Sequence, residues 1–503
     1  MAANSEEYVE PTYGNWRIPA RAGIGRLSGL TTALVFASLL LTIIVLKLGG
    51  LLEGFVTAMI CALVIAGLSY KDKYGYSILE RLIERAIFMF GKRTQKNVYR
   101  SGPLGMNKLG TYRLPGIASS CTTYEAQDTY GRNFTLVHMP AVGVYSVAIA
   151  VEPDGAALVD QPDVDQWVAN WGGFLAELGR EVGLIGAAAT VETSPGSGLK
   201  IRKEIESTIS PEATPIAQLM LAQAAETYPT GVSQTRSWIT LSFSAASRPG
   251  AKKRKPREML RELSSKIPFW CSHLESTGAG TATPLRMNEL AEIIRIAYDP
   301  ATARIFEDAY YRTEDISIDF DNIGPSATLT EWDYYRHDSG VSTCWTMTEA
   351  PRGSIFSNVL QHLLAPHQSI DRKRVTVIYR PIDSARTADI VEKDQNTART
   401  RATSTRNASE RVLADLAAAN ATAQEEARGA GLSYFGLLVA ATVEDASRLN
   451  EAIAVVEQEL APTSRIMLRR AYGAHDAVFA ATLPLGIVLG RHALLPESIK
   501  SAL

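Results

Sequence analysis

The sequence lacks the short motifs that mark nucleotide sites and hydrolase sites. A phosphate-binding loop needs the order G-x-x-x-x-G-K-[ST], because backbone amides cradle the phosphates and the Lys meets the β- and γ-phosphates. The only Gly-Lys pair is Gly91-Lys92, and Arg93 follows it. The glycine-rich stretch Pro195–Lys200 has the wrong order and predicts a loop. No G-x-S-x-G occurs, so the signature of a serine hydrolase is also missing.

Cysteine is scarce, and its spacing excludes the common metal clusters. The four cysteines are far apart in the sequence, and no C-x-x-C occurs: Cys61, Cys121, Cys271 and Cys344. Such scattered thiols suit a reducing compartment. His362 and His367 are five residues apart, which misses the i, i+4 spacing of helical zinc ligands. The acidic stretch Asp319–Asn322 has Thr330 where a calcium loop needs Glu. We therefore predict no catalytic residue, no metal site and no cofactor.

No excess of positive charge marks the 503-residue chain as a whole. Its net charge is −2, and 21% of its residues are charged, which argues against a dedicated nucleic-acid binder. Two regions are locally basic. One is the run Lys252–Arg257, and the other comprises Arg399, Arg401, Arg406 and Arg411. DNA, anionic lipid, a protein partner and solvent all remain open for these side chains, and direct contact with nucleic acid is uncertain.

Two long apolar runs near the N-terminus are the most distinctive feature present. Leu30–Leu48 carries only Lys47 as a charge, and Leu51–Leu68 carries only Glu53. At about 1.5 Å per residue each run reaches roughly 27–28 Å as a helix, close to the ~30 Å core of a bilayer. The runs predict a transmembrane helical hairpin over residues 29–70. The alternative is a pair of buried helices in a soluble core.

The flanks of the hairpin predict its orientation. Three arginines precede it and two lysines follow it: Arg17, Arg21, Arg26, Lys71 and Lys73. The positive-inside rule then places both termini in the cytoplasm. Trp16 and Arg17 would anchor the entrance in the headgroup layer. Residues 71–108 hold nine basic and three acidic side chains, a net of +6, and predict a basic juxtamembrane helix that contacts lipid through Lys92, Arg93 and Lys96.

The rest of the chain alternates strand-like and helix-like segments, which predicts a mixed α/β (α+β) fold. Expected strands and helices before residue 300 are 145–151, 160–181, 187–192, 237–244, 258–275 and 287–298. Expected elements after it are 332–337, 342–348, 375–379, 434–442, 445–460, 464–470 and 475–482. Residues 383–428 lack Gly and Pro and predict one or two long exposed helices.

The predicted organisation has six parts. They are the N-terminal tail 1–28, the hairpin 29–70, the basic helix 71–110, a first α/β domain 111–300, a connector 301–330 and a second α/β domain 331–503. Strand, helix and strand at 145–192 parallel strand, helix and strand at 434–470, as in split βαβ or ferredoxin-like modules. This parallel raises the possibility of two related halves.

The hairpin with Tyr13-Gly14-x-Trp16-Arg17-x-Pro19 resembles small two-span membrane proteins of type IV secretion and conjugation in Gram-positive, high-GC bacteria. The region 374–486, which ends in Phe479-Ala-Ala-Thr-Leu-Pro484-x-Gly486, resembles the end of the N-terminal domain of the conjugation ATPase. In that family the Leu-Pro turn leads into a P-loop motor, and here the sequence stops soon after it. The resemblance therefore implies the membrane and N-terminal part of that ATPase without its motor.

We therefore expect a non-enzymatic inner-membrane scaffold that anchors a separate motor ATPase at a translocation channel. The ATPase would dock on Arg399, Arg401, Arg406 and Arg411 and on Phe479 and Pro484. The resemblance also implies other channel subunits, membrane lipid and further copies of the chain as partners, with a hexamer as one candidate assembly. The alternatives are a membrane subunit of a type VII-like secretion system and a membrane-anchored enzyme. The cargo, whether DNA or protein, stays open.

Overall fold

The structure is a computed structural model. It describes residues 11–14, 16, 29–70, 72–76, 78–103, 105, 110–153, 155, 158–196, 205, 210, 213–227, 233–248, 250–312, 314, 316–351, 353–404 and 409–492. The chain divides into two compact units. Unit 1 comprises Met1–Asn15, Asn97–Asp389 and Gln424–Val488, and unit 2 comprises Trp16–Lys96, Ile390–Ala423 and Leu489–Leu503.

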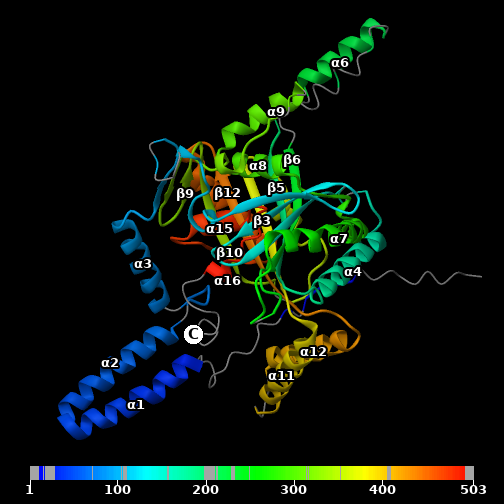
Figure 1. The fold of residues 1–503 in the computed structure, drawn as a ribbon. Coiled ribbons are helices and arrows are strands. Elements are labelled where there is room, and N and C mark those ends of the chain that lie inside the picture. Colours follow the sequence, from blue (N-terminus) through cyan, green and yellow to red (C-terminus); the bar gives the residue numbers. More distant parts are fainter. Residues whose placement is uncertain are drawn as a thin grey trace, which may run out of the picture. The chain divides into compact units, whose positions relative to one another are not determined.

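Unit 1 is built on one 13-stranded antiparallel sheet (Figure 1). Its strands before residue 300 are β1 (Val98–Arg100), β2 (Thr122–Gln127), β3 (Asn133–Met139), β4 (Val144–Glu152), β5 (Leu184–Pro195), β6 (Ser233–Ser244) and β7 (Thr281–Pro284). Those after it are β8 (Ala327–Thr330), β9 (Tyr335–His337), β10 (Gly340–Glu349), β11 (Arg372–Pro381), β12 (Ser433–Val443) and β13 (Met467–Arg470). The order is β1-β8-β9-β10-β12-β11-β5-β6-β4-β3-β2, with β7 beside β4 and β13 beside β10.

The helices of unit 1 connect these strands. They are α4 (Gln161–Leu178), α6 (Pro215–Thr227), α7 (Pro256–Leu274), α8 (Met287–Tyr298), α9 (Ala303–Tyr311), α10 (Gln361–Leu364), α13 (Leu449–Val455), α14 (Ala461–Thr463) and α15 (His475–Ala481). A π-helical turn, Val456–Leu460, joins α13 to α14. Most bounds lie within a few residues of the predicted ones, because apolar periodicity marks these segments clearly. The predicted bounds of α8 match the observed ones.

The sheet contains two modules with the same topology. The first has the strand order β5-β6-β4-β7 and the second β11-β12-β10-β13. In the order of the chain, each module runs strand, helix, strand, strand, helix, strand: β4-α4-β5 then β6-α7-β7 in the first, and β10-α10-β11 then β12-α13-β13 in the second. This is the ferredoxin-like βαββαβ arrangement. A hairpin precedes each module, β2-β3 in one case and β8-β9 in the other. A helix also follows each, α8 and α15 respectively.

The two modules meet where β5 pairs with β11. Thr190 lies opposite Thr376 in this pairing, and their hydroxyls are 2.9 Å apart. Equivalent strands that are antiparallel neighbours in one sheet are related by an approximate twofold axis normal to the sheet. The two halves are therefore related, as the sequence had suggested, but they form one continuous sheet instead of two separate domains.

The sequence predicted the wrong correspondence between the two halves, because it paired the first βαβ unit of one half with the second βαβ unit of the other. The sequence argument matched β4-α4-β5 with β12-α13-β13, whereas strand order matches β4-α4-β5 with β10-α10-β11. The reason is that α10 spans only Gln361–Leu364, which is too short to show apolar periodicity. The longer α13 therefore looked like the counterpart of α4.

Both modules bury their apolar residues on the same face of the sheet. In the first, α4 and α7 cover a cluster that includes Phe174, Leu241 and Trp270. In the second, α10 and α13 cover a cluster that includes Trp345 and Val439. The opposite face carries more small and polar side chains, and α8, α15 and residues 483–487 lie against it.

Unit 2 contains the helices α1 (Gly29–Gly49), α2 (Leu51–Ser69), α3 (Ile78–Arg93) and α16 (Leu489–His492). It also contains most of α11 (Ser384–Thr403) and α12 (Glu410–Ala427). The helices α1 and α2 form a hairpin, as predicted. A Cβ atom on Gly54 would lie 2.8 Å from Leu46 Cδ1, so glycine permits their close approach. Many apolar side chains of the hairpin are exposed, including Phe36, Leu48 and Leu51.

The prediction that residues 29–70 form a transmembrane hairpin is wrong. Among the described residues, no helix combines the length and the apolar character that a membrane crossing requires. This overturns the transmembrane hairpin in the predicted fold class and the localisation to the inner membrane. Both runs do form helices, with Lys47 in the last turn of α1 and Glu53 in the first turn of α2. An apolar run predicts a helix, but it does not show what surrounds the apolar surface of that helix.

Candidate docking surface

A long helical insertion lies in the sequence between two strands that are neighbours at the centre of the sheet. It comprises α11 (Ser384–Thr403) and α12 (Glu410–Ala427), between β11 and β12. These strands pair without interruption from Arg372 opposite Thr442 to Pro381 opposite Ser433. The Ile382 amide then donates to the Leu432 carbonyl at 2.9 Å. The two ends of the insertion are therefore held together by the sheet. The prediction of one or two long helices is confirmed, with two.

Small and apolar side chains form the buried face of the two helices. Val391 and Ala398 are buried on α11, seven residues apart, and Ala418 and Ala419 are buried on α12. Two helical turns separate the first pair, so both lie on one face. The Gln395 side-chain amide donates to the Asn420 carbonyl oxygen at 3.0 Å and links the helices. Most other side chains of the pair are left to solvent or to a partner.

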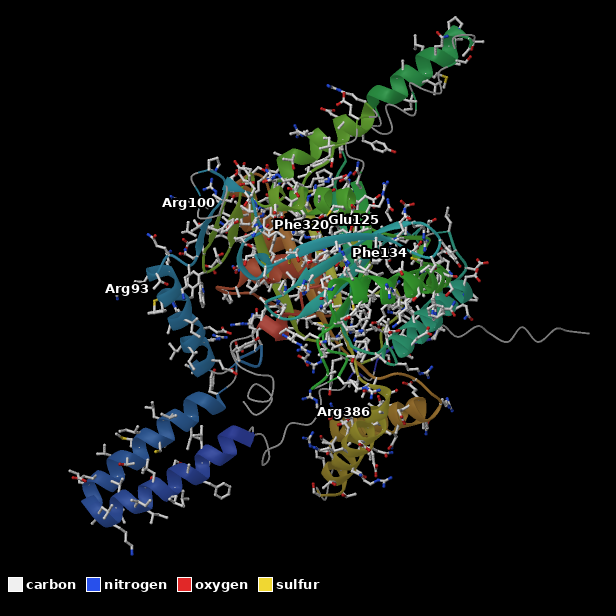
Figure 2. The ribbon with its side chains drawn as sticks, in the orientation of Figure 1. Arg93, Arg100, Glu125, Phe134, Phe320 and Arg386 are labelled. Carbon is white, nitrogen blue, oxygen red and sulfur yellow. The ribbon has the colours of Figure 1, made fainter. Side chains whose placement is uncertain are left out.

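The predicted arginines lie on this exposed surface. Arg399 and Arg401 are exposed on α11, and Arg411 is exposed near the start of α12. Arg406 lies outside the described residues. Arg386, labelled in Figure 2, is also exposed in the first turn of α11. Here "the arginine surface" denotes Arg399, Arg401 and Arg411.

The other two predicted docking residues lie in the core. Phe479 is fully buried, and the Arg374 guanidinium stacks on its ring at 4.5 Å. Pro484 is buried in the segment that follows α15. In this segment the Ser146 hydroxyl donates to the Leu485 carbonyl at 2.7 Å, and the Ser242 hydroxyl donates to the Gly486 carbonyl at 3.0 Å. The Leu-Pro turn thus packs against the first module, and a partner cannot reach Phe479 or Pro484 in this arrangement.

Gly486 explains how this turn comes so close to the sheet. Its φ is +69°, and a Cβ atom there would lie 2.2 Å from the Cβ of Ser146. Only glycine meets both demands without strain. The sequence pattern that resembles an ATPase linker therefore has a packing role in this fold.

A buried ion cluster beside Phe479 was not predicted from the sequence. Glu192 on β5 accepts from Arg372 at 2.5 Å and from Arg374 at 3.1 Å, both on β11, so the cluster joins the two modules. Arg374 also donates to the Thr482 hydroxyl at 2.9 Å. Burial alone would raise the pKa of Glu192, but the charges of Arg372 and Arg374 outweigh it and lower that pKa. The signal was present as Glu192 at the end of the expected strand 187–192 and two arginines just before the expected strand 375–379, since charged residues next to buried strands are commonly paired.

The remaining candidate residues are scattered. Trp16 is exposed, and Lys92, Arg93 and Lys96 are exposed on and just after α3. Arg17 lies outside the described residues. These positions do not test the predicted role in lipid contact.

The basic run 252–257 is partly internal. Arg254 forms an ion pair with Glu262 at 2.6 Å and donates to the Ser244 carbonyl at 2.7 Å. Lys252, Lys253, Lys255 and Arg257 are exposed around the start of α7. One arginine therefore serves the fold, and four basic side chains remain at the surface.

One Ser–His contact has the geometry of a nucleophile and its base. The Ser342 hydroxyl lies 2.8 Å from His337 Nε2, and His337 Nδ1 lies 2.6 Å from the Tyr298 carbonyl oxygen. Both side chains have 0% exposure, so no substrate can reach them. Burial also lowers the pKa of His337 to about 4. The contact is therefore structural. Across the part of the chain that the structure describes, no group of three or more His, Cys, Asp or Glu side chains could hold a metal ion.

Residues 20–80 match a family model described as a domain of unknown function, DUF8461. This segment includes α1 and α2 and is a small part of the chain, so it does not assign the whole protein to a family. No curated protein matches the sequence.

Proposed function

We propose that this protein is a non-enzymatic docking scaffold of a conjugation or type IV-like secretion system, and that a separate motor ATPase binds its α11–α12 pair. The observation that carries the proposal is the insertion itself. Two helices with a mostly exposed surface lie between β11 and β12 in the sequence, although these two central strands pair in one continuous register. Binding residues are commonly found on such insertions held by a rigid scaffold.

The positive charge of the arginine surface indicates the charge expected on the facing surface of the ATPase. The arginine surface presents guanidinium groups, which form forked hydrogen bonds with carboxylates. We therefore expect an acidic surface on the ATPase. Each exposed pair contributes roughly 0.2–1 kcal/mol, so loss of three such pairs weakens binding by about threefold to 150-fold.

The test is binding of a motor ATPase taken from a secretion system of the same genome. Arg399→Ala, Arg401→Ala and Arg411→Ala are combined in the full chain, and the dissociation constant is measured by interferometry at low salt. The matched control replaces Lys252, Lys253 and Arg257 by Ala, since it removes the same number of exposed positive charges from unit 1. The arginine variant should bind at least about threefold more weakly, and the control should bind like the wild type.

Three outcomes would contradict the proposal. Equal weakening by both variants would show that only net charge matters. Unchanged binding of the arginine variant would remove the α11–α12 pair from the interface. Failure of the wild-type chain to bind the ATPase would contradict the scaffold role as a whole.

A further inference from the structure

The two ends of the sheet differ in how their edges are protected. An edge strand exposes unpaired backbone N–H and C=O groups, and proteins blunt such edges with short strands, charges, prolines or bulges. At one end lies β1, which has three residues and includes Arg100. At the other lies β2, which has six residues, Thr122–Gln127, with Glu125 as its only charge. Figure 2 labels Arg100 and Glu125 on these strands.

The internal repeat shows that an added strand fits beside β2. The hairpin β8-β9 is the topological equivalent of β2-β3, and β1 pairs with the outer edge of β8. No strand in the described part of the chain pairs with the outer edge of β2. Every residue of β2 is exposed or half-buried. The same kind of edge is therefore covered by β1 in one half of the molecule, whereas no described strand covers it in the other half.

The open edge is held rigidly in an extended form. All six residues of β2 pair with β3. In the turn that follows, the Asp128 carboxylate accepts from the amides of Tyr130 and Arg132 at 2.9 Å and from the Arg132 side chain at 2.8 Å. The Thr129 amide donates to the Ser264 carbonyl of α7. Little conformational entropy remains to be lost when a strand adds to this edge.

We propose that β2 pairs with β2 of a second copy of this chain, antiparallel and about a twofold axis normal to the sheet. A symmetric pairing of this kind brings residues of the same face together, so the residue on the axis meets its own copy. Two registers keep five residue pairs. One places Glu125 opposite Glu125, which is unfavourable because like charges face each other.

The other register places Tyr124 on the axis. Tyr124 then faces Tyr124, an aromatic cross-strand pair, and Thr123 faces Glu125 of the second copy, where its hydroxyl can donate to the carboxylate. Thr122 faces Ala126. The strand is thus complementary to itself in one register, which is why a second copy is the occupant we favour.

Cross-linking tests this register directly. Facing residues of antiparallel strands have Cα atoms roughly 4.5–5.5 Å apart, which suits a disulfide. Tyr124→Cys is introduced into the full chain together with Cys61→Ser, because the other three native cysteines are buried. The control is Tyr130→Cys in the same background, since Tyr130 is exposed in the adjacent turn. Both are oxidised with diamide and compared on a non-reducing gel.

The Tyr124→Cys chain should form disulfide-linked dimers about tenfold faster than the control, because pairing raises the local thiol concentration. Tyr124→Lys should lower the dimer fraction in sedimentation velocity, because two ammonium groups would face each other, and Tyr130→Lys should leave it unchanged. Equal cross-linking at the two positions would overturn the proposal. If the thiol introduced by Tyr124→Cys neither cross-links nor reacts with a maleimide, the proposal is also overturned, because another chain would then cover the edge.

Discussion

Two buried histidines make the stability of unit 1 depend on pH. His337 and His475 both have 0% exposure, and burial lowers the pKa of each to about 4. At His475, the Cys344 amide donates to Nδ1 at 3.1 Å and Nε2 lies 3.2 Å from the Trp332 carbonyl oxygen. At His337, Nε2 lies beside the Ser342 hydroxyl, which lies 2.7 Å from that of Thr442. Each ring therefore has one nitrogen that accepts, and protonation would remove that hydrogen bond.

The sign and size of the effect follow from linkage. The folded-state pKa values lie below the ordinary value of about 6.5, so the unfolded chain binds protons more readily between pH 4 and 6.5. Stability is therefore complete above about pH 6.5 and falls as the pH drops toward 4. At pH 5.0 each histidine should cost about 2 kcal/mol relative to pH 7.5.

Urea unfolding of the full chain at pH 7.5 and 5.0, followed by tryptophan fluorescence, measures this loss. His337→Gln and His475→Gln should each reduce the loss between the two pH values by about 2 kcal/mol, whatever their effect at pH 7.5. His362→Gln, at an exposed position on α10, should not change it. If the loss is the same in both variants as in the wild type, the histidines are not the groups that resist protonation.

Three further predictions concern the ion cluster, the hairpin and nucleotide binding. Glu192→Gln leaves Arg372 and Arg374 buried without their carboxylate, so it should lower the free energy of unfolding by about 3–5 kcal/mol in urea denaturation. A loss below about 1 kcal/mol would contradict the buried pairing. Replacing Gly29–Ser69 with a flexible linker removes much exposed apolar surface and should reduce self-association in light scattering, and an unchanged molar mass would show that the hairpin does not mediate it. The purified chain should show no saturable binding of a labelled ATP analogue at micromolar concentration, because it lacks a P-loop, and saturable binding would reveal a nucleotide site of another kind.

The individual helices and strands were the most predictable part of this fold. Alternation in 237–244 and the 3.6-residue period in 287–298 each reflect one buried face, which the sequence records directly. Their arrangement was less predictable, because nothing local says that β6 lies between β4 and β5. The prediction that the hairpin crosses a membrane was wrong for a related reason. An apolar run predicts a helix, but nothing local says what surrounds that helix.

The docking residues show where a motif and an exposed surface differ. Arg399, Arg401 and Arg411 lie in a segment without the apolar periodicity of a core helix, and that absence correctly predicted exposure. Phe479 and Pro484 were chosen because their pattern resembles a linker in another family. In this fold the pattern serves packing, since Gly486 permits an approach to Ser146 that any side chain would block. A motif carried over by resemblance keeps its role only if its surroundings are also kept.

The buried cluster of Glu192, Arg372 and Arg374 completes the argument about the two halves. Most of the central pairing is small or apolar, with Ala187 to Ala189 facing Tyr379 to Val377, and such strands specify register weakly. A slip of one residue would turn Arg374 away from Glu192 and toward the opposite face of the sheet. The cluster thus favours one register over its neighbours, and the hydrogen bond between Thr190 and Thr376 favours the same one. These charged and polar residues, which were not predicted to interact, therefore define how the two modules join.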